Sequence, residues 1–326
     1  MRIVITDIDQ DSVEPEREVA AAAGAELVVA RASSPAELAE QAAGADGLVV
    51  QYARIDAALL DALPTVRAVG RYGVGVDTVD VEACTARGVA VCNVPDYGTE
   101  AVSDHAIALA LAAARRIPWM DRGVRAGTGG LEAVRPLHGF GGRVFGVLGL
   151  GLIGAATARK AAGLGYRVLG VDARHEPGTT VAGVEVVELA QLLRRAHVVS
   201  VHVPLTPATH HLLGASELAL LGPDAVLVNT SRGGVVDTGA LVEALRAGRL
   251  HGAGLDVFET EPLPAGHPLT ELDQVVLTPH LAWYTEESYG ELKRRTVQNV
   301  VDVLSGRGSP HVLNPGALRG SGDAGA

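Results

Sequence analysis

A strand, a glycine-rich turn and a helix between residues 144 and 172 constrain this chain more than any other stretch. The apolar run 144–148 leads into three glycines with the spacing GxGxxG, at Gly149, Gly151 and Gly154, and an alanine-rich helix follows. In such a turn the first glycine permits the tight bend, the second lets the backbone approach a pyrophosphate, and the third lets the helix pack on the strand. The next strand ends in Asp172, close to the ~20-residue offset at which an acid binds the ribose hydroxyls. The pattern predicts a dinucleotide site.

The glycine spacing alone is weak evidence, because 40 of the 326 residues are glycine, and a purely structural glycine turn is the alternative. The strand before it, the helix after it and the acid beyond favour the dinucleotide site. A carboxylate at Asp172 repels the 2′-phosphate of NADP, so the sequence predicts NAD. Arg174, two residues further on, leaves NADP open.

The length of the chain predicts two domains, and a composition with 48% hydrophobic and 20% charged residues is globular. A net charge of −11 without long charged runs argues against a nucleic-acid partner. Cys84 and Cys92 lie in apolar surroundings, so no disulfide framework is predicted. The chain starts with a strand pattern rather than a signal peptide, and no apolar run approaches the ~20 residues of a membrane span. We therefore expect a cytoplasmic protein without a membrane partner.

Short apolar strands alternate with helical stretches up to residue 97, which predicts a small parallel sheet. The expected strands span residues 3–6, 26–30, 47–51, 68–72 and 89–94, and the expected helices span 16–23, 35–43 and 56–63. After the fourth strand, the loop 71–77 reads RYGVGVD and lacks a third glycine. The N–H groups of Val74 and Gly75 could bind a carboxylate there, and a simple glycine turn is the alternative.

Two long helices are expected at 99–116, with Thr99 as its N-cap, and at 285–304. Between them, after an irregular arm, six strands are expected at 144–148, 167–171, 198–203, 225–229, 253–257 and 274–277, with helices at 187–195 and 238–247. Six strands suffice for a complete doubly wound dinucleotide domain. We predict an α/β fold in which a Rossmann domain, residues 100–284, is inserted into a smaller flavodoxin-like domain, residues 1–99 and 285–326. Both crossings would then act as a hinge, and a disordered tail is expected from Gly320.

Three strand ends of the inserted domain carry side chains suited to chemistry on a keto acid. Arg232 offers a planar fork for a carboxylate, and Glu261 paired with His280 would favour the imidazolium. Such a histidine can protonate a carbonyl oxygen while hydride arrives at the carbon. Taken singly, each residue also has a structural explanation: a surface ion pair, a solvated loop charge, and a histidine bonded to a backbone carbonyl.

Taken together, five motifs give the chain a family resemblance. They read VCNVP at 91–95, VPLTP at 203–207, SRGGVVD at 231–237, LDVFETEP at 255–262 and TPHLAWY at 278–284. Through them the chain resembles the D-isomer-specific 2-hydroxyacid dehydrogenases, and within these most closely the branch that includes the C-terminal-binding proteins. The resemblance covers nearly the whole chain.

The resemblance implies a function and a set of site residues. The function is that of an NAD-dependent D-2-hydroxyacid dehydrogenase, or 2-keto-acid reductase, without a metal, in a homodimer formed through the inserted domain. The implied catalytic residues are Arg232, Glu261 and His280. The implied cofactor contacts are Gly149, Gly151, Leu152, Ile153, Gly154, Asp172, Pro204, Thr230, Ser231, Asp256 and His280, with Asp256 near the nicotinamide amide. The implied substrate contacts are Tyr52, Arg71, Val74, Gly75, Arg232 and Trp283.

One departure from the family pattern concerns the arm after the first long helix. Residues 127–130 read GTGG where the family usually has Gly-x-Trp, which puts the local dimer contact in doubt. Two other functions remain as alternatives. One is a nucleotide-sensing scaffold or corepressor-like protein with weak dehydrogenase activity, and the other is an enzyme with the same fold that oxidises a donor such as formate or phosphite.

Overall fold

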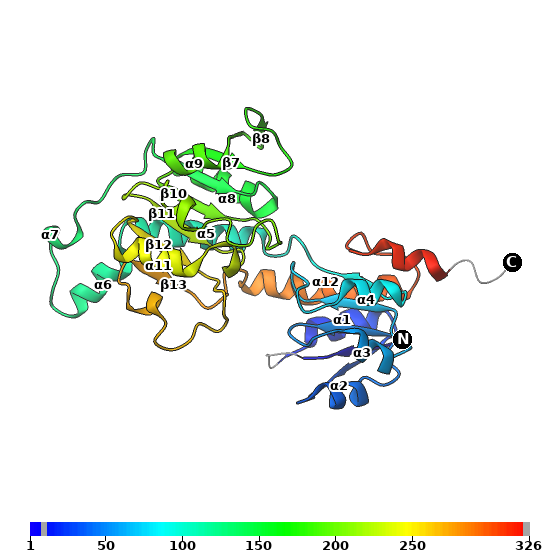
Figure 1. Ribbon diagram of the computed structural model, residues 1–326. Coiled ribbons are helices and arrows are strands. Elements are labelled where there is room, and N and C mark those ends of the chain that lie inside the picture. Colours follow the sequence, from blue (N-terminus) through cyan, green and yellow to red (C-terminus); the bar gives the residue numbers. More distant parts are fainter. Residues whose placement is uncertain (8–11, 322–326) are drawn as a thin grey trace. The chain divides into compact units, whose positions relative to one another are not determined.

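The computed structural model describes residues 1–7 and 12–321 and divides the chain into two compact units (Figure 1). Unit 1 comprises Met1–Gly98 and Thr285–Ala326, and unit 2 comprises Thr99–Tyr284. Each unit is an α/β structure built on its own sheet. The prediction of two doubly wound α/β units is therefore confirmed. Most of the tail expected to be disordered from Gly320 lies outside the described residues.

Unit 1 contains a five-stranded parallel sheet with the order β2-β1-β3-β4-β5. This is the strand order of flavodoxin-like folds, in which ligands bind at the carboxyl ends of the strands. The strands are β1 (Arg2–Ile5), β2 (Glu26–Val29), β3 (Gly47–Val50), β4 (Ala68–Arg71) and β5 (Ala90–Cys92).

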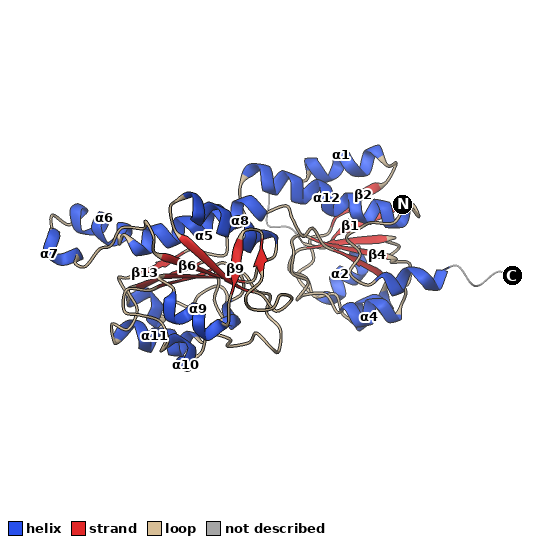
Figure 2. Cartoon of the chain, turned by 90° about the horizontal axis from the view of Figure 1, so that it is seen from above, coloured by secondary structure: helices blue, strands red, loops and turns tan. Residues whose placement is uncertain are grey.

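Helices cover both faces of the unit 1 sheet, with α1 and α12 on one face and α2 and α4 on the other (Figure 2). Their bounds are α1 (Glu14–Ala22), α2 (Pro35–Gln41), α3 (Ala57–Ala62), α4 (Val81–Ala86), α12 (Glu286–Leu304) and the 3₁₀ segment η3 (Pro315–Ser321). Polar side chains fix several helix starts: Ser34, Asp56 and Thr285 each accept a hydrogen bond from a backbone N–H in the first turn.

Unit 2 contains an eight-stranded sheet with the order β13-β12-β11-β10-β6-β7-β9-β8. All of its neighbouring strands are parallel except β8 and β9, which form a hairpin. The strands are β6 (Val144–Leu148), β7 (Arg167–Val171), β8 (Thr180–Val181), β9 (Val184–Val186), β10 (Val198–Val201), β11 (Val226–Asn229), β12 (Gly252–Leu255) and β13 (Val275–Leu277).

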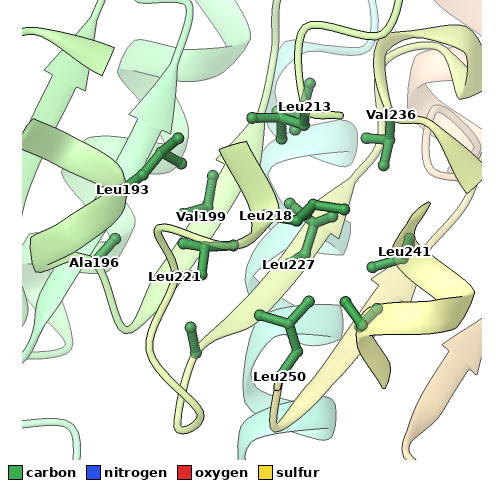
Figure 3. Packing of buried hydrophobic residues seen from close by; sticks show 14 of the residues in the cluster. Leu193, Ala196, Val199, Leu213, Leu218, Leu221, Leu227, Val236, Leu241 and Leu250 are labelled. Atoms are coloured by element: carbon green, nitrogen blue, oxygen red, sulfur yellow. The ribbon is translucent and has the colours of Figure 1, made fainter. Parts of the chain in front are cut away.

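Two hydrophobic cores hold helices against the two faces of the unit 2 sheet. Helices α5 and α8 lie on one face, and α9, α10 and α11 lie on the other (Figure 2). The core beneath the second group packs Leu193, Leu218 and Leu241 of the helices with Val199 and Leu227 of the strands (Figure 3). The helices of unit 2 are α5 (Thr99–Ala114), α6 (Ile117–Arg125), α7 (Leu131–Val134), α8 (Leu152–Gly163), α9 (Leu189–Arg195), α10 (Ala215–Leu218), α11 (Thr238–Arg246), and the 3₁₀ segments η1 (Gly233–Val235) and η2 (Pro268–Glu271). No helix in the described part of the chain is long and apolar enough to span a bilayer.

Several sequence predictions for unit 2 were wrong in detail. The sheet has eight strands rather than six, because the β8–β9 hairpin is too short to give an alternating pattern. Thr99 is not an N-cap: it is already helical, and its hydroxyl has no hydrogen-bond partner among the described residues. Helix α5 ends at Ala114, and Arg116 takes a left-handed conformation with φ of 51°. Helix α9 starts at Leu189 rather than at 187.

Candidate active site

The residues predicted to bind cofactor and carry chemistry follow the carboxyl ends of strands in the unit 2 sheet. The glycine turn follows β6 and Asp172 follows β7, whereas Arg232 follows β11, Asp256 follows β12 and His280 follows β13. Strand order reverses between β10 and β6. Strands β7 to β9 are added on one side of β6, and β10 to β13 are added in turn on the other side. In open α/β sheets a ligand binds at such a reversal, outside the carboxyl ends.

The three glycines form a tight junction between β6 and α8. Gly149 has φ of +92°, a conformation that side chains disfavour, and its N–H donates to the carbonyl of Val171. A Cβ on Gly154 would lie 1.8 Å from the carbonyl oxygen of Gly149, so only glycine permits this approach of helix and turn. A Cβ on Gly151 would meet nothing within 4 Å, which leaves space beside the start of the helix.

The start of α8 presents backbone donors toward that space. Gly151 is the N-cap and provides no side-chain cap, so the first N–H groups, which include those of Leu152 and Ile153, have no capping side chain among the described residues. Leu152 is 58% exposed. Uncapped donors at the positive end of a 12-residue helix suit a pyrophosphate.

Asp172 is held by an unusually complete set of donors. Its carboxylate accepts from the backbone N–H groups of Leu150 at 2.8 Å and Arg174 at 2.9 Å. The Arg174 guanidinium adds a bidentate pair at 3.0 and 2.9 Å. These hydrogen bonds, foremost those from the Arg174 side chain, hold the pKa of Asp172 well below its usual range. The side chain is therefore a fixed carboxylate at the end of β7.

A nicotinamide dinucleotide fits the residues along this edge. Besides the open space at Gly151, the hydroxyl of Thr230 is buried and has no hydrogen-bond partner in the described part of the chain. A buried hydroxyl without a partner is costly unless a ligand or water meets it. Ser231 donates its hydroxyl to the carbonyl of Val203, next to the exposed Pro204. This hydrogen bond joins the loops after β10 and β11.

His280 and Glu261 form a short hydrogen bond. The histidine Nδ1 lies 2.6 Å from Glu261 Oε2, and the backbone N–H of Phe258 donates to Glu261 Oε1 at 2.9 Å. Burial alone would raise the pKa of Glu261, but the hydrogen bonds from His280 and Phe258 and the charges of His280 and Arg232 outweigh it and lower that pKa. The carboxylate is charged at neutral pH and orients the ring through Nδ1, so that Nε2 takes no part in this hydrogen bond.

The Arg232 loop lies directly against the Glu261 loop. A Cβ on Gly233 would sit 1.9 Å from the carbonyl carbon of Phe258, so the two backbones meet at a position where only glycine fits. Asn229, the last residue of β11, accepts from the N–H of Ser231 at 3.0 Å and donates to the carbonyl of Arg232 at 2.9 Å. This asparagine turn fixes the backbone from which the guanidinium extends.

Asp256 holds the turn that carries His280. Its buried carboxylate accepts from the Thr278 hydroxyl at 2.6 Å and from the N–H groups of Leu281 and Ala282 at 3.0 and 2.9 Å. The N–H of His280 donates to the Asp256 carbonyl at 2.8 Å. His280 itself has φ of +56°, a conformation that non-glycine residues adopt at a cost and that surrounding contacts must enforce.

The predicted substrate residues are divided between the two units. In unit 1, Tyr52 is 62% exposed and Val74 is 43% exposed, and Arg71 lies against Gly73 in the same loop as Val74. No acceptor among the described residues meets the N–H of Val74 or of Gly75. In unit 2, the indole of Trp283 donates to the carbonyl of His280 at 2.9 Å.

Two contributors to the site were missed in the sequence. The role of Asn229 could have been inferred, since asparagine at a strand end before a turn is a known local signal. His105 lies in α5, 173 residues before Thr278 in the sequence, and its Nε2 is 2.9 Å from the Thr278 hydroxyl. No spacing in the sequence links a residue in that helix to the turn after β13.

Fold and site together define a nucleotide-dependent oxidoreductase of the doubly wound class. Residues 107–282 match the family model described as "D-isomer specific 2-hydroxyacid dehydrogenase, NAD binding domain". The chain belongs to the D-isomer-specific 2-hydroxyacid dehydrogenases.

Proteins that are similar in sequence or structure carry names that fit this family. A glyoxylate reductase of Korarchaeum cryptofilum is 44% identical over 265 residues, covering 80% of each chain. Among solved structures, the TT0316 protein of Thermus thermophilus is 37% identical with a TM-score of 0.87, covering 96% of this chain and 100% of the other. An NADPH-dependent glyoxylate/hydroxypyruvate reductase of Sinorhizobium meliloti is 30% identical with a TM-score of 0.85, covering 96% and 98%. Closeness to the branch with the C-terminal-binding proteins stays a prediction.

Proposed function

We propose that this chain is an NADH-dependent reductase of small 2-keto acids such as glyoxylate and hydroxypyruvate. The observation that carries the proposal is the 2.6 Å Glu261–His280 pair, on a loop packed against the Arg232 loop at the carboxyl edge of the sheet. The names of the similar proteins support the substrate class.

Each residue of the trio has a distinct role in the proposed reaction. Arg232 binds the carboxylate and carbonyl oxygens of the keto acid through its planar fork. His280 donates a proton from Nε2 to the carbonyl oxygen, and Glu261 stabilises the charged imidazolium before transfer. The bound dinucleotide supplies the hydride. In the reverse direction His280 accepts the hydroxyl proton.

The test is NADH consumption with a panel of glyoxylate, hydroxypyruvate, phenylpyruvate and branched 2-keto acids. His280→Ala lowers kcat by about 10²–10⁴, the usual contribution of general acid catalysis, and keeps NADH binding. Arg232→Lys raises KM strongly, because a point charge does not replace a bidentate fork. Wild-type turnover in His280→Ala would refute the assignment, and tight NADH binding without turnover of any keto acid would favour a scaffold.

Cofactor preference rests on Asp172. Its fixed negative charge at the end of β7 favours ribose hydroxyls and opposes a 2′-phosphate, which supports NAD over NADP. Arg174 covers the same carboxylate and is the residue through which NADP could still bind. Asp172→Ala therefore lowers the ratio of kcat/KM for NADH to that for NADPH. An unchanged ratio would contradict this role for Asp172.

The substrate contacts in the proposal extend to unit 1. The N–H groups of Val74 and Gly75 bind the substrate carboxylate, and Tyr52, Arg71 and Trp283 contact the remainder of the keto acid. A cation and an indole suit a substrate with a further polar or bulky end. Arg71→Met should then raise KM for hydroxypyruvate more than KM for glyoxylate, and an equal change for both would remove Arg71 from that role.

Self-association is the remaining part of the proposal, with a second copy of the chain bound at α6 and α7. Helix α6 buries none of its residues, and Ile117, Val124 and Leu131 are 50%, 76% and 63% exposed. Apolar side chains so placed are typical of an interface. Light scattering should give twice the 33.5 kDa mass of the chain, and Val124→Glu should lower it. A monomeric wild type would refute the dimer.

A further inference from the structure

His105 lies outside the residues assigned to the reaction, yet it reaches the turn that carries His280. It is on α5, and its Nε2 lies 2.9 Å from the Thr278 hydroxyl and 3.7 Å from Asp256 Oδ1. Its side chain is 27% exposed, whereas that of Asp256 is 1% exposed. Among the described residues, His105 is the one cationic or potentially cationic side chain within ion-pair distance of this buried carboxylate.

The packing of α5 explains why His105 reaches this point. Leu109, one helical turn further along, lies over β12, where a Cβ on Gly254 would be 2.7 Å from the Leu109 Cβ. Residues four apart share a helix face and are separated by about 6 Å along the axis. His105 therefore lies one turn before Leu109 on the face that packs on β12, and it contacts Thr278 and Asp256 at the carboxyl end of that strand.

The hydrogen-bond directions in this group are determined by its chemistry. The Thr278 hydroxyl has one proton and lies 2.6 Å from the Asp256 carboxylate, which can only accept. The hydroxyl therefore donates to Asp256 and accepts from His105, so Nε2 of His105 carries a proton. Donation runs in one direction, from His105 through Thr278 to Asp256.

The end of this chain of hydrogen bonds is the backbone of the reactive histidine. Asp256 accepts from the N–H groups of Leu281 and Ala282, while its own carbonyl accepts from the N–H of His280. These hydrogen bonds hold the backbone at and just after His280, whose φ is +56°. A conformation of this kind persists only where neighbouring contacts hold it.

We propose that His105 is a positioning residue for the reaction: by donating to Thr278 it orients Asp256, and Asp256 holds the 278–282 turn so that His280 faces the keto acid. The inference rests on the proposed function. His105 touches neither substrate nor dinucleotide in this proposal, so its main effect is on the rate of proton transfer and its effect on cofactor binding is small.

The test compares two substitutions at His105. His105→Leu removes the donor at similar volume, and His105→Gln places an amide N–H near the position of Nε2. We expect kcat with glyoxylate to fall about tenfold in His105→Leu, the effect of losing one hydrogen bond in a buried network, with KM and the NADH dissociation constant within about twofold of wild type. His105→Gln should recover most of kcat.

Asp104→Asn is the matched control on the same helix. It removes an ion pair of Asp104 with Lys160, touches nothing in the His280 turn, and should leave kcat unchanged. If His105→Leu fails to fold, Thr278→Val and Thr278→Ser provide the same comparison, with the serine variant retaining activity.

The outcomes separate this inference from the function on which it rests. A wild type that reduces no keto acid refutes the proposed function. An active wild type with unchanged kcat in His105→Leu refutes the positioning role. Equal losses in His105→Leu, His105→Gln and Asp104→Asn also refute it, because they show general destabilisation of α5.

Discussion

Replacing Glu261 by glutamine tests the electrostatic part of the site without changing its shape. The carboxylate accepts the His280 Nδ1 hydrogen bond at 2.6 Å, and a hydrogen bond to a charged group contributes about 1.5–3 kcal/mol. Both side chains are partly solvated, at 42% and 34% exposed, so the lower part of that range applies, about 1.5–2 kcal/mol. At 1.36 kcal/mol per tenfold, Glu261→Gln should lower kcat/KM for glyoxylate by about 10–30-fold.

A similar pair on the same loop provides the control. Glu259 Oε2 lies 3.0 Å from His211 Nε2, and these side chains are 35% and 36% exposed. Glu259→Gln removes a comparable ion pair that does not involve His280, and it should leave kcat/KM within about twofold, the usual scale for a surface pair. Steady-state kinetics, with NADH binding followed by fluorescence, measures both variants. Equal losses in the two variants, or none in Glu261→Gln, would refute the reasoning.

Three further predictions concern stability and local packing. Gly233→Ala should lower activity and the free energy of unfolding by at least about 1–3 kcal/mol, because a Cβ there meets the Phe258 backbone at 1.9 Å; chemical denaturation measures this, and a wild-type midpoint would contradict it. Burial lowers the pKa of His202 from 6.5 to about 4. The unfolded state therefore takes up this proton at a higher pH than the folded state does, and the free energy of unfolding falls as pH drops below 6.5, by about 2 kcal/mol at pH 5. Denaturation curves at pH 7 and pH 5 should show a smaller loss of stability in His202→Asn than in the wild type. Burial raises the pKa of Glu16, whose carboxylate accepts from Tyr72 at 2.8 Å, so its contribution to stability is full below 4.5, its ordinary value, and is lost as pH rises through its folded pKa. The stability of Glu16→Gln should therefore fall less than that of the wild type as pH rises above 4.5, and parallel curves would refute this.

The sequence predicted the parts of the fold that local pattern determines. Long apolar strands with glycine turns, such as 144–148, and helices with a polar cap, such as the one after Asp56, were located to within one or two residues. The β8–β9 hairpin was missed because strands of two and three residues have no measurable period. Thr99 was misjudged because a threonine before an apolar helix has the same sequence pattern whether it caps the helix or begins it.

The sequence identified candidate site residues only where the residue type is itself characteristic of the chemistry. Arginine, glutamate and histidine after strand ends were found as candidates, because such chemistry depends on a few residue types at the edge of a parallel sheet. The pairing of Glu261 with His280 was predicted and is present, but the backbone contacts that hold these residues were not found: the asparagine turn at Asn229 is local, whereas the approach of Gly233 to Phe258 joins two loops. The bond from His105 to Thr278 joins residues 173 positions apart.

The separation of β6 and β7 from β11, β12 and β13 within one sheet has a consequence for protein engineering. The turn and acid proposed to select the dinucleotide follow the first pair of strands, and the residues proposed for proton transfer follow the other three, with β10 between the two groups. Asp172 and His280 share no hydrogen-bond partner among the described protein residues, and substitutions at distant sites without shared protein partners add their free energies. Variants of Asp172 and His280 can therefore be screened in separate libraries and then combined, with each change retaining its own effect.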